Sequence, residues 1–498
     1  MMQRLFQRFP NPAGYLLLLA GYFLLQWLLR VGTAGGFEMD EAEQLILGQR
    51  LQVGYSPDPP LYTWLQIPLL RLFGDGVVAL SLLKNLLLFA TYASSYFVAR
   101  HAGLGRDQSA LAALSLILLP GIGWESQRDL THSVLVTTLA AVSLWVAMAL
   151  LDGRRGWGQY LLLGLALGFG IISKWNYWLF AGALLVSLGS LQPRLLLNRR
   201  FALSLLLAAA IAAPFLLWMS GNLAVATATS YKLEVTEAGY LSHLGKGLYS
   251  LGKSYLEFGA LFVLIFLLLF QPWHRPTTKL PGGKRPPGLR LLLRLFWAVL
   301  GLLLLFLLVS GGTVFRSRWM LPMLCYLPIM LFALASPGIW QPRTVQRYQW
   351  LLLLVMLLIP VGLAGRVYLA PLTGRYTKPH FPAVELAVEL RKAAGPVRLV
   401  VAQDTFIGGN LKPNLPGSLV AAPAVDFPLL SIQGDDATPV LLVWNADEYV
   451  TLPPSLQSYL TQRLTSDLKP LGSPSVIERN YRLSKDRSYR LGWQLMSR

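Results

Sequence analysis

The chain has 498 residues, of which 54% are hydrophobic and only 13% are charged. A soluble domain carries about 25% charged residues, so the composition excludes a water-soluble globular protein. The formal net charge of +19 would suit a nucleic-acid-binding protein, but the placement of the basic residues favours a membrane protein instead. The single cysteine, Cys325, excludes an intramolecular disulfide and a cysteine-rich metal site.

Apolar runs of membrane-spanning length recur over the first three quarters of the chain. They predict an all-α polytopic membrane protein with about eleven transmembrane helices. The predicted spans are 14–30, 77–99, 108–123, 131–151, 159–173, 176–190, 201–219, 256–271, 291–310, 317–335 and 348–365. A single helix over 159–190 would be roughly 46 Å long, which exceeds a hydrocarbon core of about 30 Å. The segment "SKWNYW" also interrupts this run, so a break is predicted at 173–176.

The first apolar run follows two arginines, as in a signal peptide. It is long and many spans follow it, so we interpret it as a retained first helix. Cleavage after the small residues 32–36 is the alternative.

The basic residues test this topology, because cytoplasmic loops of membrane proteins are rich in Lys and Arg. With the N-terminus in the cytoplasm, most of them fall in cytoplasmic loops. These are Arg4, Arg8, Arg100, Arg106, Arg154, Arg155, Arg194, Arg199, Arg200, Arg275, Lys279, Lys284, Arg285, Arg290, Arg343 and Arg347. The short outer loops carry only Arg128, Lys174, Arg316 and Arg318. The pattern, with an odd number of spans, predicts a C-terminus on the outer side of the membrane.

The composition changes near residue 366, where charged residues become common. Short β-type runs at 396–405 and 438–450 and an amphipathic helix at 383–394 predict a small C-terminal α/β domain. The predicted organisation is a transmembrane domain, 1–365, with long periplasmic loops at 31–76 and 220–255, and a periplasmic domain, 366–498.

Carboxylates gather directly after the first span, in "DEAEQL" (40–45), although the chain has only 24 Asp and Glu. Asp40, Glu41 and Glu43 alternate with apolar residues in a pattern that predicts a short interfacial helix with its apolar side in lipid. The carboxylates would then face the helix bundle or water. Alternatively, they only favour the positive end of a helix dipole.

The next polar segment is "GYSPDPPLYTWLQIP" (54–68). Its prolines predict a stiff extended stretch before interfacial aromatic residues that include Tyr62. Asp58 lies between prolines, so it cannot occupy the interior of a regular helix. It is either a site residue or a turn aspartate.

Further polar groups lie at the outer ends of later spans. "GWESQRDLTHSVL" (123–135) contains Arg128, Asp129 and His132, of which Arg128 and Asp129 could simply form a local pair. Lys174 lies in an outer loop, against the charge bias. It is either a snorkelling anchor or an anion ligand.

Arg316 and Arg318 lie at the same predicted depth as Lys174. Together these cations favour a phosphate-binding rim. No phosphate-binding glycine loop or dinucleotide fingerprint is present, so no nucleotide cofactor is expected. A carboxylate base beside cations suits group transfer from a lipid-linked phosphate donor.

Several motifs resemble those of the bacterial GT-C glycosyltransferases, which include aminoarabinose transferases of lipid A, galacturonosyltransferases of lipopolysaccharide and the protein O-mannosyltransferase superfamily. The resemblance covers roughly residues 15–335. The motifs are "DEAEQL", "GYSPDPPLYTWL", "RDLTHSVL", "GFGIISKWNYW" and "FRSRWMLP".

The resemblance implies sugar transfer from a polyprenyl phosphate to a periplasmic hydroxyl. It implies a catalytic role for Asp40, with Glu41 beside it, and a place near the donor phosphate for Lys174. Two positions depart from the family pattern. Asp58 stands where relatives often have His or Lys, and His132 stands where many have Asp.

Some members of the family bind a divalent metal, for which only His243 could match, in poorly matching surroundings. Metal dependence therefore stays open.

The expected activity is that of an inverting glycosyltransferase. Asp40 accepts the proton of an acceptor hydroxyl on lipid A, another envelope glycan or a protein. Lys174, with Arg128 or with Arg316 and Arg318, stabilises the departing phosphate.

The alternative is a transporter or flippase of lipid-linked sugars. Such a protein would need charged residues within its spans and usually a repeat, whereas the charges are assigned to span ends and no repeat is apparent. Nucleic acid is not an expected partner.

Overall fold

The computed structural model describes residues 12–33, 35–56, 58–226, 240–272, 285–425, 439–463 and 468–497. The chain divides into two compact units. The first, called the helical unit here, comprises Met1–Gln26, Lys84–Gly221 and Ala228–Ile359. The second, the α/β unit, comprises Trp27–Leu83, Asn222–Thr227 and Pro360–Arg498. The α/β unit therefore joins the C-terminal residues to the first long loop of the chain.

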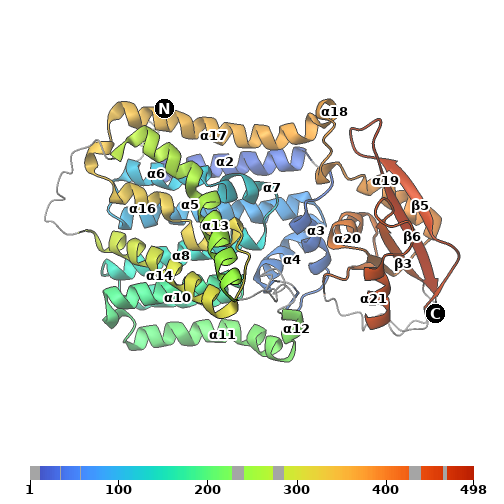
Figure 1. Cartoon of the computed structure of the whole chain (residues 1–498), viewed down its shortest axis with the longest axis horizontal. Coiled ribbons are helices and arrows are strands. Elements are labelled where there is room, and N and C mark those ends of the chain that lie inside the picture. Colours follow the sequence, from blue (N-terminus) through green and yellow to red (C-terminus); the bar gives the residue numbers. More distant parts are fainter. Residues whose placement is uncertain are drawn as a thin grey trace. The chain divides into compact units, whose positions relative to one another are not determined.

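Apolar helices account for every predicted span (Figure 1). Within the ranges described above, seven helices are long and apolar enough to cross a membrane, or up to nine if each of two bent helix pairs counts as one span. The seven are α2 (Ala13–Gly32), α5 (Val77–His101), α8 (His132–Leu151), α11 (Arg199–Gly221), α13 (Tyr240–Phe270), α14 (Pro287–Ser310) and α17 (Pro342–Tyr368).

The bent pairs and two shorter helices cover the other predicted spans. The first pair runs over Arg106–Leu118 and Gly121–Arg128, and the second over Ser317–Leu324 and Leu327–Leu334. The shorter helices are α9 (Trp157–Ile171) and α10 (Asn176–Leu191), which confirm the predicted break at 173–176.

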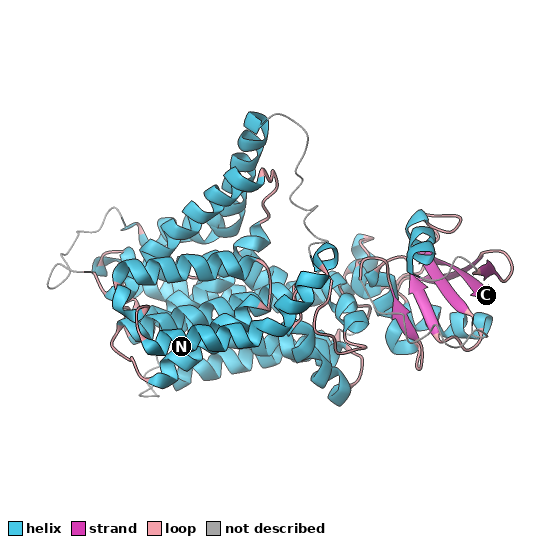
Figure 2. Cartoon of the chain, turned by 90° about the horizontal axis from the view of Figure 1, so that it is seen from below, coloured by secondary structure: helices cyan, strands magenta, loops and turns pink. Residues whose placement is uncertain are grey.

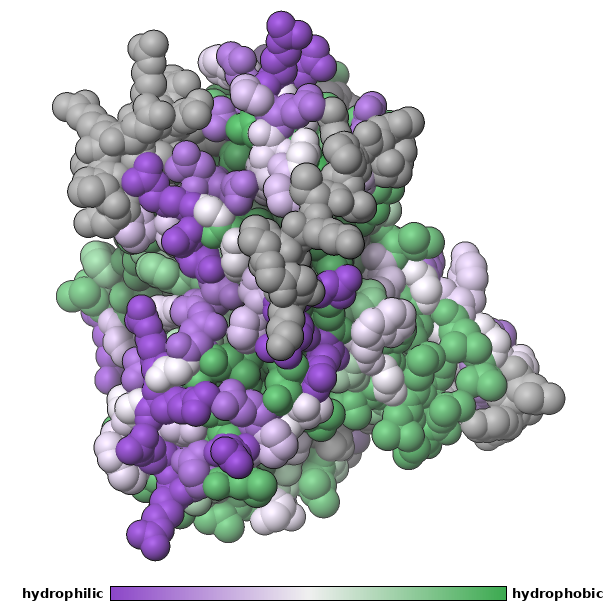
Figure 3. All heavy atoms as spheres, turned by 90° about the vertical axis from the view of Figure 1, so that its left-hand side faces the viewer, coloured by the Kyte–Doolittle hydropathy of each residue, from purple (hydrophilic) through white to green (hydrophobic). Residues whose placement is uncertain are grey.

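One end of the helical unit gathers helix ends that the topology places in the cytoplasm. His101 at the end of α5 contacts Asp152, which follows α8, and Arg294 of α14 donates to Ser190 Oγ of α10 over 2.8 Å. Hydrophilic side chains cover much of the end where α11 and α17 begin (Figure 3). Of the predicted cytoplasmic cations, Arg4, Arg8, Arg275, Lys279 and Lys284 lie outside the described residues.

Helix α13 begins earlier than expected, because it includes residues 240–255, which the sequence predicted as part of a long loop. The first turns alternate apolar residues with His243, Lys246 and Lys253, so a criterion based on unbroken apolar runs misses them. Burial nevertheless follows a helical period, as at Leu251, Phe258 and Phe262.

The α/β unit contains one sheet in the order β2-β1-β3-β6-β4, with β5 also paired to β6 (Figure 2). Strands β1 (Leu399–Ala402), β2 (Leu419–Ala421) and β3 (Val440–Asn445) are parallel. The antiparallel strands are β4 (Lys469–Pro470), β5 (Ser475–Asn480) and β6 (Ser488–Ser497). Helices α19 (Ala383–Ala394), α20 (Thr405–Leu411) and α21 (Pro454–Arg463) complete this part of the unit. The predicted helix and both predicted strand regions are confirmed.

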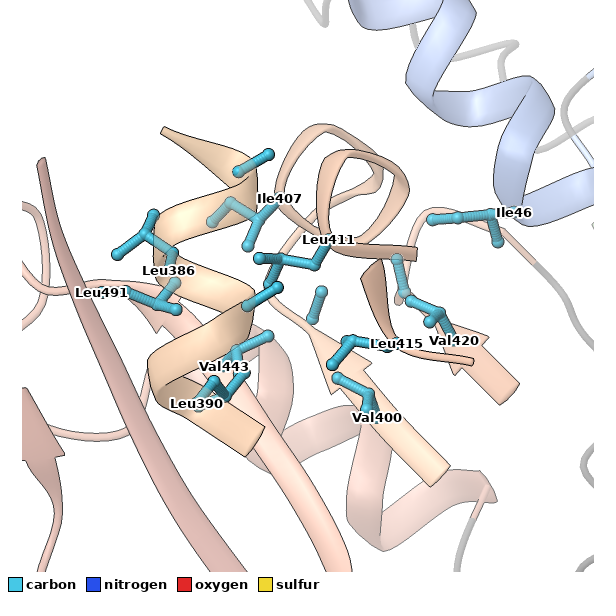
Figure 4. Close-up of a cluster of buried hydrophobic side chains, with 14 of the residues drawn as sticks. Ile46, Leu386, Leu390, Val400, Ile407, Leu411, Leu415, Val420, Val443 and Leu491 are labelled. Atoms are coloured by element: carbon cyan, nitrogen blue, oxygen red, sulfur yellow. The ribbon is translucent and has the colours of Figure 1, made fainter. Parts of the chain in front are cut away.

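The short helix α3 (Met39–Leu47) packs into the core of the α/β unit. Ile46 is fully buried with Leu411 and Val420 in a hydrophobic cluster that also includes residues of α19 and the sheet (Figure 4). The side-chain amide of Gln49 both donates to and accepts from the backbone of Val420, over 2.8 and 2.9 Å. The prediction that the apolar side of this helix lies in lipid is therefore wrong, because Ala42 and Ile46 are buried in protein.

Close packing of α3 against α20 depends on glycine at position 409. A Cβ atom there would overlap the backbone carbonyl of Ala42, which cannot move without moving α3. The sequence "FIGGNL" (406–411) supplies two adjacent glycines, which let the two helices approach closely.

Gly409→Ala should displace α3 and lower the free energy of unfolding by about 2 kcal/mol or more, because overpacking against backbone cannot relax cheaply. Thermal unfolding of the purified protein measures this. Gly365→Ala is the matched control, because its Cβ would meet only Leu369 Cδ1 at 3.6 Å. Equal stability of the two variants would contradict the packing argument.

Candidate functional site

Two buried ion pairs hold the start of α3. Arg30, at the end of α2, bonds to the carboxylate of Glu41 over 2.6 Å, and Arg366, near the end of α17, bonds to Glu38. The Glu41 side chain is 0% exposed and its carboxylate also accepts the backbone N–H of Glu38 over 3.2 Å. Both acids therefore have structural partners that fix the N-terminus of α3.

Asp40 lies differently from its neighbour. Successive residues of a helix point about 100° apart, and Asp40 is partly exposed where Glu41 is buried. Glu43 is also partly exposed, on the same helix. Among the three candidate acids of α3, Asp40 is thus the one that is both accessible to solvent and fixed in the first helical turn.

Helix α4 (Leu61–Phe73) supplies polar side chains that lie beside α3. Thr63 donates to the amide oxygen of Gln44 over 3.0 Å, and both are fully buried. Burial raises the pKa of Tyr62, and the carboxylates of Glu41 and Asp40 raise it further. Tyr62 therefore stays a neutral hydrogen-bonding group beside the acids.

Gln66, one turn beyond Tyr62, is fully buried, and its amide makes no hydrogen bond to the residues that the structure describes. Sequence reasoning did not single out Gln66. Asp58, partly exposed, lies in the segment that precedes α4.

A cluster of polar groups forms in the helical unit around the start of α8. Lys174, in the break between α9 and α10, donates to Ser133 Oγ over 2.9 Å. Lys84 of α5 approaches the carbonyl oxygen of Asp129 at 3.4 Å. His132, beside Ser133, is buried. The structure thus brings Lys174, Asp129 and His132 to the same end of this unit.

Lys84 is the main residue that sequence reasoning missed. It is 1% exposed and lies inside the apolar run 77–99, so the statement that charges occupy only span ends is wrong. The signal was present in "LSLLKNLLLF" (80–89), because an ionisable residue within a span suggests a functional site. Its neighbour Asn85 accepts a hydrogen bond from Gln127 over 3.2 Å, which continues the polar cluster.

The remaining predicted cations occupy two places. Arg128 forms an ion pair with Glu125 over 2.5 Å, so the suggested local pair with Asp129 is replaced by one with Glu125, three residues earlier in the chain. Arg316 and Arg318 directly precede Trp319, whose carbonyl accepts a hydrogen bond from the Asn176 amide over 3.0 Å. Because Asn176 is two residues from Lys174, the two predicted cation segments lie together in the helical unit.

The metal prediction has no supporting ligand set. Within the ranges that the structure describes, no three His, Cys, Asp or Glu side chains come together as metal ligands. His243 is buried on α13 in the helical unit. Metal dependence therefore stays open, and no catalytic step below uses a metal ion.

The chain resembles known envelope glycosyltransferases over almost its full length. Residues 57–218 match the family described as dolichyl-phosphate-mannose-protein mannosyltransferase. The lipopolysaccharide core galacturonosyltransferase RgtB of Rhizobium johnstonii is 32% identical over 96% of both chains. RgtA of the same organism, also a lipopolysaccharide core galacturonosyltransferase, is 33% identical over 92% of this chain and 91% of its own.

The fold has a solved counterpart. The crystal structure of ArnT from Cupriavidus metallidurans, bound to undecaprenyl phosphate, superposes with a TM-score of 0.60 over 97% of this chain and 98% of its own, at 15% identity. Helical membrane architecture, this GT-C fold and the identity to RgtB together define an integral membrane glycosyltransferase. The chain belongs to the family of bacterial GT-C glycosyltransferases that contains the lipopolysaccharide core galacturonosyltransferases.

Lys84→Met should reduce sugar transfer by about 100-fold, the effect expected when a buried, oriented cation is lost from a charged transition state. The variant should keep the thermal stability of the parent or exceed it, because Met fills the space without burying a charge. Thr91→Val, another buried position on α5, is the control and should stay active. Transfer at the parental rate by Lys84→Met would make the lysine a structural group only.

Proposed function

We propose that this enzyme transfers galacturonic acid from a polyprenyl-phosphate donor to a hydroxyl of the lipopolysaccharide core at the periplasmic face of the inner membrane. The observation that carries the proposal is the identity to two lipopolysaccharide core galacturonosyltransferases, which extends over nearly the whole of each chain. The fold shared with an undecaprenyl-phosphate-bound enzyme supports a lipid-linked donor. A transporter would not account for this relationship.

Asp40 is the proposed general base. Its carboxylate accepts the proton of the acceptor hydroxyl while the hydroxyl oxygen forms a bond to the anomeric carbon of the sugar. The bond from that carbon to the phosphate oxygen breaks on the opposite side, so the configuration inverts. The partial exposure of Asp40 supports this role, and such catalysis typically contributes 10²–10⁴-fold. The buried, ion-paired Glu41 positions the helix that carries Asp40.

The departing polyprenyl phosphate gains negative charge that cations must stabilise. Lys84 and Lys174 are the primary candidates, because their contacts place both beside the start of α8. Arg316 and Arg318 are secondary candidates, in a segment that contacts the start of α10. Arg128 is less suited, since Glu125 already neutralises it.

The proposed orientation has a cytoplasmic N-terminus and a periplasmic C-terminus. The basic residues at the end of the helical unit where α5, α8 and α10 finish support it. In this orientation Asp40 and the sheet of the α/β unit face the periplasm, where the core saccharide of a lipopolysaccharide would be accessible.

Transfer by the purified enzyme tests the proposal. Polyprenyl-phosphate-linked galacturonic acid and a lipopolysaccharide lacking this sugar serve as substrates, and the product is measured by mass spectrometry. Asp40→Asn keeps the size of the side chain but removes its basicity, so transfer should fall at least about 100-fold at unchanged thermal stability. Glu43→Gln, on the same helix, is the control and should stay active.

Two outcomes would contradict parts of the proposal. If the parent enzyme transferred no galacturonic acid but transferred another lipid-linked sugar, the donor assignment would be wrong. If Asp40→Asn retained more than about a tenth of the activity, the base assignment would fail, because the loss would be smaller than a general base contributes.

A further inference from the structure

Two segments of the α/β unit form a basic and aromatic surface. The first is 374–380, "GRYTKPH", which follows α17, and the second is 481–487, "YRLSKDR", which joins β5 to β6. Together they contain five cations against the single acid Asp486. The cations are Arg375, Lys378, Arg482, Lys485 and Arg487. We name these two segments the basic surface.

Direct contacts hold the two segments together. The rings of Tyr376 and Tyr481 stack with centroids 5.9 Å apart and planes 13° apart. Arg482 donates its backbone N–H to the carbonyl of His380 over 2.8 Å. His380 is fully buried and its Nε2 contacts the carbonyl oxygen of Val367 at 2.9 Å, which ties the surface to the end of α17. The basic surface is therefore a built feature and not two independent loops.

Three of the five cations of this surface have no ion-pair partner among the residues that the structure describes, whereas Lys378 interacts with the neighbouring carboxylate of Asp404. Arg375, Lys485 and Arg487 are exposed, and none of them forms a salt bridge with a residue that the structure describes. Of two further acids near these segments, Asp447 has a cationic partner, whereas Glu448 has a neutral one. Asp447 lies 3.7 Å from Arg490, and Glu448 accepts a hydrogen bond from Gln403 over 3.1 Å.

The surface adjoins the segment that leads to the proposed base. Gly36 donates its backbone N–H to the carbonyl of Pro379 over 2.9 Å, and Arg482 donates to the carbonyl of Thr33 over 3.2 Å. Asp40 follows Gly36 by four residues, so their Cα atoms are at most about 14 Å apart. The basic surface and the segment that leads to Asp40 therefore pack against each other within the α/β unit.

We propose that the basic surface binds the anionic core saccharide of the acceptor lipopolysaccharide and thereby directs its hydroxyl to Asp40. This inference rests on the proposed function. Arginine and lysine bind carboxylate and phosphate groups of such a saccharide. The partly exposed, stacked pair Tyr376 and Tyr481 supplies aromatic surface for contact with the C–H groups of a sugar, at a small cost in side-chain entropy.

The test is a charge reversal on the full-length enzyme in nanodiscs of phosphatidylcholine. The variant Arg375→Glu/Lys485→Glu/Arg487→Glu changes only exposed side chains. The control, Arg391→Glu/Lys392→Glu/Lys469→Glu, makes the same change in charge at exposed positions on α19 and β4 of the same unit. Three quantities are measured for the parent and both variants, namely the binding of the detergent-free core oligosaccharide, the KM for the acceptor and the KM for the donor.

The surface variant should bind the oligosaccharide at least about tenfold more weakly, because exposed charge pairs contribute up to roughly fivefold each and reversal adds repulsion. The KM for the acceptor should rise equally, while the KM for the donor stays unchanged. The affinity of the parent should fall with added salt, as the Debye length shortens. The control variant should match the parent.

Binding separates this proposal from the proposed function. If the parent transfers galacturonic acid and both variants bind the oligosaccharide equally, the proposed function stands and the basic surface has no part in acceptor binding. If the parent binds the oligosaccharide through this surface but transfers no sugar, the proposed function fails and the binding assignment stands. An effect of the surface variant that occurs only in phosphatidylglycerol nanodiscs would assign the surface to membrane headgroups and overturn the proposal.

Discussion

The buried ion pair between Arg30 and Glu41 is the interaction on which the arrangement of the site depends. It joins the end of the first long helix to the first turn of α3, and a second pair, Glu38 with Arg366, joins that turn to the end of α17. Breaking a buried pair by removing one partner typically costs 3–5 kcal/mol, because the remaining charge stays buried. The two pairs therefore define where Asp40 can lie.

The rest of the α/β unit supports the same short helix from other sides. Ile46 enters the hydrophobic cluster of the sheet, Gly409 lets α20 approach, and Gln49 bonds to the backbone of β2. Tyr62 and Thr63 of α4 contribute polar groups beside it. A catalytic group needs a position fixed within about 0.5 Å, and a helix held on all these sides provides it better than a free interfacial helix would. The sequence therefore places the carboxylate of Asp40 on a rigid helix that belongs to the α/β unit.

Unbroken apolar runs made the helical architecture predictable. Short β-type runs between turn residues predicted β1 and β3, and an amphipathic pattern predicted α19. The partners of α3 were not predictable, because Ile46 and Gln49 meet residues about 370 positions away in the chain. Helix α13 was predicted too short, since its first turns are amphipathic and not wholly apolar. Lys84 was overlooked, although its position within an apolar run indicated a functional residue. The ion pairs of Glu38 and Glu41 could be identified only from the structure.

In this mechanism Glu41 positions the proposed base by its ion pair with Arg30 and takes no part in proton transfer. A double-mutant cycle with Arg30→Met and Glu41→Gln, followed by both thermal unfolding and transfer rate, tests it most directly. Each single change should lower stability and rate together, and the double variant should be no worse than either single variant. Loss of all transfer in Glu41→Gln at parental stability, or strictly additive effects, would contradict it.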